Sequence, residues 1–224
     1  MARIEKERIS FETPDHCRIV GDFYFENGKK SVAQPCVVLV HEFKKGREQW
    51  NSFAAALVSA GYKVLAYDVR GHGESANLKD VTSVLSDPQL APFDFDGAVT
   101  WLTHRKGVDA GRLASIGVSF GAYVACGGNA AYREQVKATV AISCSLKGAL
   151  TFLSHKPGER AMHKVLYMAG KGQPAKDAAE LSDKYTSGAR TVKIFDETAA
   201  QGIDLLNTKP EAMEIILEWL NENL

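Results

Sequence analysis

A serine at position 119 lies in a pattern that presents a nucleophile. The segment 117–121 reads Gly-Val-Ser-Phe-Gly, after an apolar run and before a stretch of small residues. Between a strand and a helix, such a G-x-S-x-G places the serine hydroxyl on a sharp turn, where it can attack a carbonyl carbon. A serine hydroxyl is almost never ionised near neutral pH, so it needs a neighbouring base to take its proton. The question is which residue supplies that base.

Apolar runs and helical patterns alternate along the chain. Continuous apolar runs predict buried strands at 36–41, 62–68, 112–119, 136–145, 164–170 and 191–197. Helical spacing predicts helices at 50–60, 94–104, 120–132, near 176–187, and at 210–223. Two segments that alternate, 3–12 and 17–26, predict an antiparallel hairpin. We therefore expect an α/β fold: a mostly parallel central sheet of about eight strands, with an N-terminal antiparallel hairpin and helices on both faces.

Length and charge limit the organisation and the partners. The 224 residues fit a single domain over 1–224, in which 146–163 forms a short irregular excursion in place of a cap. The chain has 27 basic and 27 acidic residues, hence a net charge of zero. This balance argues against nucleic acid and against an anionic membrane as the main partner, since both call for a basic surface.

Targeting signals and cysteine usage predict a cytoplasmic protein. The N-terminal segment 1–12 is charged and has no apolar core of a signal peptide. No apolar run reaches the length of a membrane-spanning helix. The four cysteines are scattered and none form C-x-x-C, which favours reduced, mostly buried thiols.

From about Cys36 onward, the chain resembles the α/β-hydrolase superfamily. The segment VVLVHEFKKGREQW resembles the strand and loop that supply one oxyanion-hole amide, and YDVRGHGES matches the D-x-R-G-H-G-x-S loop. GVSFGA matches the nucleophile elbow, and TAAQGIDLL resembles the loop that usually reads G-x-G-H-G. The resemblance, to small and nearly capless esterase-like members, implies that Ser119 is the nucleophile. It also implies that the backbone amides of Phe43 and Phe120 form the oxyanion hole.

The resemblance also assigns structural roles to residues around these loops. It implies that the loop containing His72 is structural and that His41 orders the oxyanion loop. Lys44, Lys45 and Arg47 follow closely, and we expect them to form a solvated basic turn. The alternative is that this turn attracts an anionic ligand to the mouth of the pocket.

Amides replace both titratable members of the usual catalytic triad. The acid is expected after 164–170, where the sequence reads GKGQP, with Gln173 in its place. The base is expected after the last strand, where AQG places Gln201. Gln201 can hydrogen-bond the Ser119 hydroxyl but cannot take its proton, and Gln173 can orient Gln201. We therefore expect both glutamines beside Ser119, with weak or no hydrolysis and a binding role.

Glu42 leaves an alternative open. Dienelactone-hydrolase-like members carry a glutamate at this place, beside the nucleophile, and a partly desolvated carboxylate with a raised pKa can act as a base. In this alternative, the protein is an active serine hydrolase of carboxylic esters that uses Glu42. Both hypotheses take a small-molecule ligand or an ester-like substrate, and neither calls for a metal or a cofactor.

Overall fold

A single eight-stranded sheet organises the molecule. The computed structural model describes residues 3–75, 78, 80–87, 90–153 and 162–224. The strands are β1 (Ile4–Glu12), β2 (Arg18–Glu26), β3 (Gln34–Val40), β4 (Lys63–Tyr67), β5 (Val108–Val118), β6 (Val136–Ile142), β7 (Met162–Gly170) and β8 (Thr186–Phe195). Their spatial order is β1-β2-β4-β3-β5-β6-β7-β8. β1 and β2 are antiparallel to their neighbours, and β3 to β8 are parallel, which confirms the predicted fold class.

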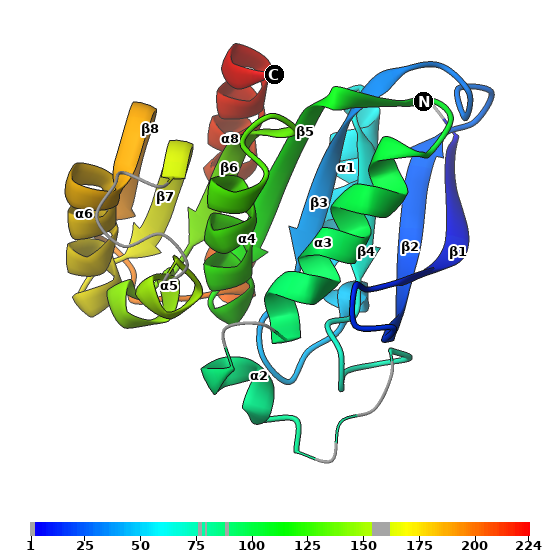
Figure 1. The fold of residues 1–224 in the computed structure, drawn as a ribbon. Helices are drawn as coiled ribbons and strands as arrows, with labels where there is room; N and C mark the ends of the chain where they lie inside the picture. Colours follow the sequence, from blue (N-terminus) through cyan, green and yellow to red (C-terminus); the bar gives the residue numbers. More distant parts are fainter. Residues whose placement is uncertain (1–2, 76–77, 79, 88–89, 154–161) are drawn as a thin grey trace.

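Helices cover both faces of this sheet (Figure 1). The longer helices are α1 (Asn51–Ser59), α3 (Leu90–Thr103), α4 (Phe120–Ala131), α6 (Gln173–Tyr185) and α8 (Glu211–Asn223). The short ones are η1 (Arg47–Trp50), α2 (Ser83–Ser86), α5 (Leu146–Leu153) and α7 (Ile203–Thr208). α1 and α8 pack in one apolar core on one face, and α3, α4 and α6 bury their apolar sides on the other. Among the described residues, no helix has the length and apolar character needed to cross a bilayer.

The segment 146–163 differs from its prediction. Its first half is not irregular but forms α5, which packs on α4 and buries Ala149, Phe152 and Leu153. The apolar side of this helix finds a partner in α4 that the chain pattern does not reveal. Residues 154–161 lie outside the described part of the chain, and the excursion ends before its predicted limit of 163, because β7 begins at Met162.

Several boundaries also differ from their predictions. α6 begins at Gln173 rather than near 176, because Pro174 in its first turn needs no amide partner. β8 begins directly after α6, at Thr186, five residues before the apolar run that predicted it. Its first half is mostly exposed at the sheet edge, so it has no apolar signal.

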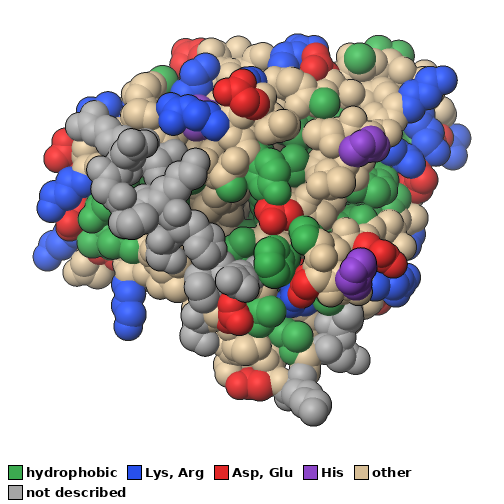
Figure 2. Space-filling model, in the orientation of Figure 1, with side chains coloured by type: hydrophobic (Ala, Val, Ile, Leu, Met, Phe, Trp, Pro, Cys, Tyr) green, Lys and Arg blue, Asp and Glu red, His purple; other side chains and the backbone are tan. Residues whose placement is uncertain are grey.

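The space-filling view shows how side chains are distributed over the face that α3 and α4 cover. Charged side chains lie mostly around its periphery, and hydrophobic side chains gather near its middle (Figure 2). The parallel strands β3 to β8 end at one common edge of the sheet, so the loops that follow them meet there. In open α/β sheets, ligands bind at this edge.

Two glycines permit a very close approach of backbone segments at the end of β5. A Cβ on Gly117 would overlap the carbonyl group of Gly121. A Cβ on Gly121 would overlap the carbonyl oxygen of Val40 and lie 2.6 Å from that of His41. The end of β5, the first turn of α4 and the end of β3 therefore meet backbone to backbone. No side chain larger than hydrogen fits between them.

We expect Gly121→Ala to lower the free energy of unfolding by at least about 2 kcal/mol, because its methyl group must displace backbone rather than a flexible side chain. Urea unfolding followed by circular dichroism measures the change. Gly111→Ala is the matched control, since a Cβ there meets only Asp109 Oδ1 at 3.5 Å. Equal stabilities of the two variants would contradict this packing.

Candidate active site around Ser119

Ser119 occupies a strained turn between β5 and α4. Its backbone has φ 51° and ψ −116°, a region that residues with a side chain rarely adopt. Its amide donates to the carbonyl of Ile142 over 2.8 Å, and α4 begins at the next residue. Ser119 remains half-buried. This is the geometry of a nucleophile elbow, with the hydroxyl at the edge where the parallel strands end.

The two expected oxyanion-hole residues lie next to one another. The rings of Phe43 and Phe120 meet edge to face, with centroids 6.2 Å apart. In the described part of the chain, neither backbone amide donates a hydrogen bond to another protein group. Amides without a protein acceptor are available to the oxygen of a bound carbonyl, so the oxyanion hole stays a prediction.

Two histidines hold the loop that carries Phe43. His41 is buried; its Nδ1 donates to the carbonyl of Glu42 over 2.8 Å, and its Nε2 accepts from the amide of Val69 at 2.9 Å. His72 Nε2 accepts from the amide of Lys44 at 3.1 Å. Both rings therefore act through their hydrogen bonds to backbone. Burial lowers the pKa of His41 to about 4, so it is neutral at physiological pH.

Arg47 departs from the expected solvated basic turn. Its side chain is fully buried, and its guanidinium pairs with Asp68 and, at 2.7 Å, with Glu74. Its amide also donates to Asp68 Oδ1 over 2.8 Å. Lys44 and Lys45 are exposed as predicted. Arg47 can be buried because the carboxylate of Asp68, directly after β4, compensates its charge. The same ion pair connects the loop after β3 to the neighbouring strand.

Glu42 points toward the loop that would carry a catalytic base. A Cβ on Gly202 would overlap Glu42 Oε2, so the carboxylate lies directly against this glycine. The backbone of Ile203 also hydrogen-bonds it. Partial burial raises the pKa of Glu42 above its ordinary value. Within the described residues, no hydrogen bond joins this carboxylate to Ser119.

The two glutamines do not form the expected chain to Ser119. Gln173 is exposed and donates to Asp177 Oδ1 over 2.6 Å, one turn further along α6. Asp177 in turn accepts from the amide of Leu146. Gln201 is exposed, and no hydrogen bond links it to Ser119 or to any other group in the described part of the chain. A charged acceptor on its own helix binds Gln173 more strongly than a second amide would.

The segment after β6 carries site residues that the sequence reading did not assign. Ser143 has φ 52°, and its Oγ accepts from the amide of Gly202 at 2.9 Å. Ser145 Oγ donates to the hydroxyl of Tyr123 over 2.9 Å. The sequence did offer one signal for these site residues, namely two serines at the end of the strand that pairs with β5. Their partners, however, come from distant parts of the chain.

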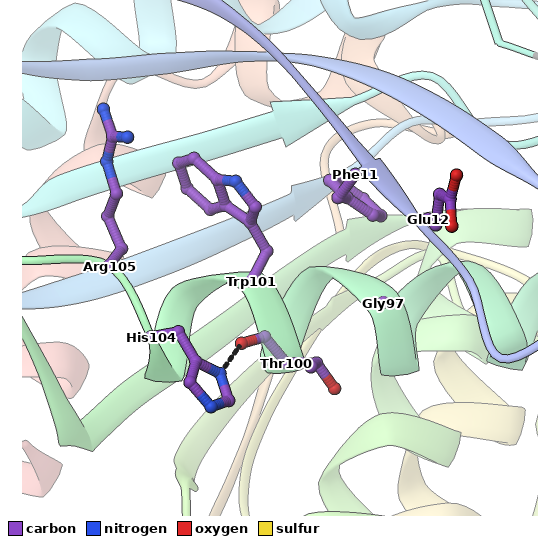
Figure 3. A pocket seen from close by; sticks show the side chains of 7 residues that line it. All are labelled: Phe11, Glu12, Gly97, Thr100, Trp101, His104 and Arg105. Carbon is purple, nitrogen blue, oxygen red and sulfur yellow. Dashed lines mark hydrogen bonds between the residues drawn. The ribbon is translucent and has the colours of Figure 1, made fainter.

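A pocket of about 370 Å³ lies away from this site, between β1 and α3 (Figure 3). It is lined by Phe11, Glu12, Gly97, Thr100, Trp101, His104 and Arg105. His104 uses Nδ1 to bond the carbonyl of Thr100, and the Arg105 guanidinium lies 4.8 Å from the centroid of Trp101. None of the elbow or oxyanion residues lines it. The described residues contain no cluster of His, Cys, Asp or Glu suited to a metal ion.

Comparison with known proteins agrees with this architecture. The family model described as serine aminopeptidase, S33, matches residues 31–200, so the chain belongs to this family of α/β hydrolases. Two uncharacterised proteins of Mycobacterium tuberculosis, from strains CDC 1551 and H37Rv, are 30% identical over 119 residues. The match covers 53% of this chain and 39% of each relative, well under half of their length.

Solved structures share the fold at low sequence identity. An esterase of Pyrococcus furiosus has a TM-score of 0.77 and 20% identity, covering 98% of this chain and 93% of its own. A dienelactone hydrolase of Anabaena variabilis has a TM-score of 0.74 and 18% identity, covering 99% of both chains. A hypothetical protein of Pseudomonas aeruginosa has a TM-score of 0.78 and 15% identity, covering 100% of this chain and 95% of its own.

We expect His41 to stay neutral down to about pH 5. Because its pKa falls from an ordinary 6.5 to about 4, the unfolded chain binds more protons between these values. Stability is therefore lost as pH falls through this window. Histidine NMR across pH 4–8 measures the titration, with the urea-unfolded chain as reference. A midpoint near 6.5 in the folded protein would contradict the buried, doubly hydrogen-bonded ring.

Proposed function

We propose that the protein binds a small carbonyl-containing ligand at Ser119 and hydrolyses esters weakly or not at all. The observation that carries the proposal is the pairing of an ordered nucleophile elbow with loops that lack a histidine. The sequence has no histidine after His163, so neither of the loops that follow β7 and β8 supplies an imidazole. The glutamines there, Gln173 and Gln201, have no pKa useful for proton transfer.

The remaining parts of the site support binding. Ser119 is held at the elbow, and the amides of Phe43 and Phe120 have no protein acceptor among the described residues. Aromatic rings pack beside the elbow, since Phe120 meets both Tyr123 and Phe152 edge to face. Two free donors beside apolar walls suit an ester, an amide or another small acyl compound. The family description names an aminopeptidase and two structural relatives are an esterase and a dienelactone hydrolase, so both esters and amides are worth testing.

We expect slow hydrolysis of p-nitrophenyl acetate and butyrate, no more than roughly 10³–10⁴-fold above the uncatalysed rate, because an oxyanion hole and binding alone contribute that much. Ser119→Ala should abolish the part that depends on the serine. Amino-acid p-nitroanilides should react still more slowly, since an amide has the poorer leaving group. Serine-dependent turnover in the ordinary enzymatic range, about 1–10³ s⁻¹, would contradict the proposal.

Glu42 supports the alternative of an active serine hydrolase of carboxylic esters. Its carboxylate lies against Gly202, next to the expected base position, and its pKa is raised. In the same assay, Glu42→Gln separates the two functions. If serine-dependent turnover is lost in Glu42→Gln but kept in Glu218→Gln, Glu42 is established as the base. Glu218 is the matched control because it is exposed on α8, far along the chain.

Restoring the missing groups tests the assignment of the two glutamines. We expect Gln173→Asp combined with Gln201→His to raise the Ser119-dependent ester rate by at least tenfold, because an imidazole can take the proton that an amide cannot. Gln201→His alone should give part of the gain. The control is the same pair in a Ser119→Ala background, which should gain nothing. An unchanged rate in the double variant would mean that these positions do not face Ser119.

A further inference from the structure

Tyr123 lies one helical turn after Ser119, on the same side of α4. Its ring packs against Phe120 and Phe152, with centroids 6.3 and 6.4 Å away. A Cβ on Gly148 would overlap the ring, so the glycine of α5 leaves the space that the ring occupies. Helix α4, two aromatic neighbours and α5 thus constrain where the phenol hydroxyl points.

A directed chain of hydrogen bonds ends at this hydroxyl. The amide of Gly148 donates to Ser145 Oγ over 3.1 Å, and Ser145 Oγ donates to Tyr123 Oη over 2.9 Å. A phenol has a single proton, and since Tyr123 accepts from Ser145, that proton is left for another acceptor. Ser119, one helical turn earlier, is the other side chain close enough to this phenol to lower its pKa.

Tyr123 acts as a donor rather than as a base. Burial raises the pKa of its phenol above the ordinary value, so the hydroxyl stays protonated at neutral pH. Because Ser145 already donates to this oxygen, the phenol proton is free to be donated to an acceptor such as Ser119 Oγ. Gln201, where the resemblance places the base, is exposed and takes no part in this chain.

We propose that Tyr123 is the positioning residue for Ser119: its hydroxyl donates to Ser119 Oγ and stabilises negative, tetrahedral adducts formed on that oxygen. The inference rests on the proposed function, because it assigns the hydrogen-bond partner of the same serine. It also narrows the ligand class to electrophiles that accept the serine oxygen and retain a negative charge, such as boronic acids and activated carbonyl compounds. A hydrogen bond to a charged oxygen contributes more than one between neutral groups.

Binding of phenylboronic acid to the full chain tests this assignment. Ser119 Oγ donates an electron pair to boron, the hydroxyl proton leaves to solvent, and an anionic tetrahedral boronate results. We expect Tyr123→Phe to weaken binding about 10-fold, as removal of a hydrogen bond to a charged group does. Ser145→Ala should weaken it about 3-fold, because the chain loses its alignment. Isothermal titration measures the dissociation constant, and ¹¹B NMR confirms tetrahedral boron.

Tyr132→Phe is the matched control. Tyr132 follows the last residue of α4, away from Ser119, and should leave the dissociation constant within twofold. Urea unfolding checks that each variant is folded. An unchanged dissociation constant in Tyr123→Phe would overturn the proposal.

A second measurement distinguishes failure of the proposed function. If Ser119→Ala binds the boronate as well as the wild type does, no serine adduct forms and the proposed binding mode fails. Tyr123 is then judged by a double-mutant cycle of Ser119→Ala and Tyr123→Phe in urea unfolding. A hydrogen bond between them predicts about 3- to 10-fold non-additivity in the unfolding equilibrium constant. Effects of the two substitutions on the unfolding equilibrium constant that are additive to within about 1.5-fold, roughly the limit of the method, would overturn the assignment of Tyr123.

Discussion

The arrangement of the site depends on the backbone contact between the ends of β3 and β5 and the first turn of α4. Gly117 and Gly121 permit it, because any side chain there would overlap a carbonyl group. The contact holds Ser119 at a positive φ and places the oxyanion loop after β3 beside it. Strain of this kind persists only where the surroundings over-determine the conformation, as the sheet and helix do here.

Buried polar groups help to hold the loops around this contact, in addition to apolar packing such as that of Phe43 on Phe120. Arg47 pairs with Asp68, and His41 and His72 accept backbone amides of neighbouring loops. Each of these groups would be costly to bury alone, and each is satisfied by a partner from another strand end. The D-x-R-G-H-G-x-S motif therefore holds the loop that carries Phe43 in position.

The proposed function separates hydrogen bonding from proton transfer. Beside the serine, Ser145 donates a hydrogen bond to Tyr123. In the assignment from the sequence, Gln173 and Gln201 take the places of the acid and the base, and an amide can hydrogen-bond but cannot take up a proton. Glu42 differs from these amides, because it is a carboxylate with a raised pKa that lies beside Gly202.

The sequence by itself determined the α/β fold, the elbow at Ser119 and the absence of an imidazole after the last strand, because these depend on local pattern and residue identity. Only the tertiary structure decided which groups meet. α5 formed because α4 offered an apolar partner, and Arg47 became buried because Asp68 from another strand compensates its charge. Ser145 reached Tyr123 on helix α4, since side-chain partners are chosen by distance in space and not along the chain.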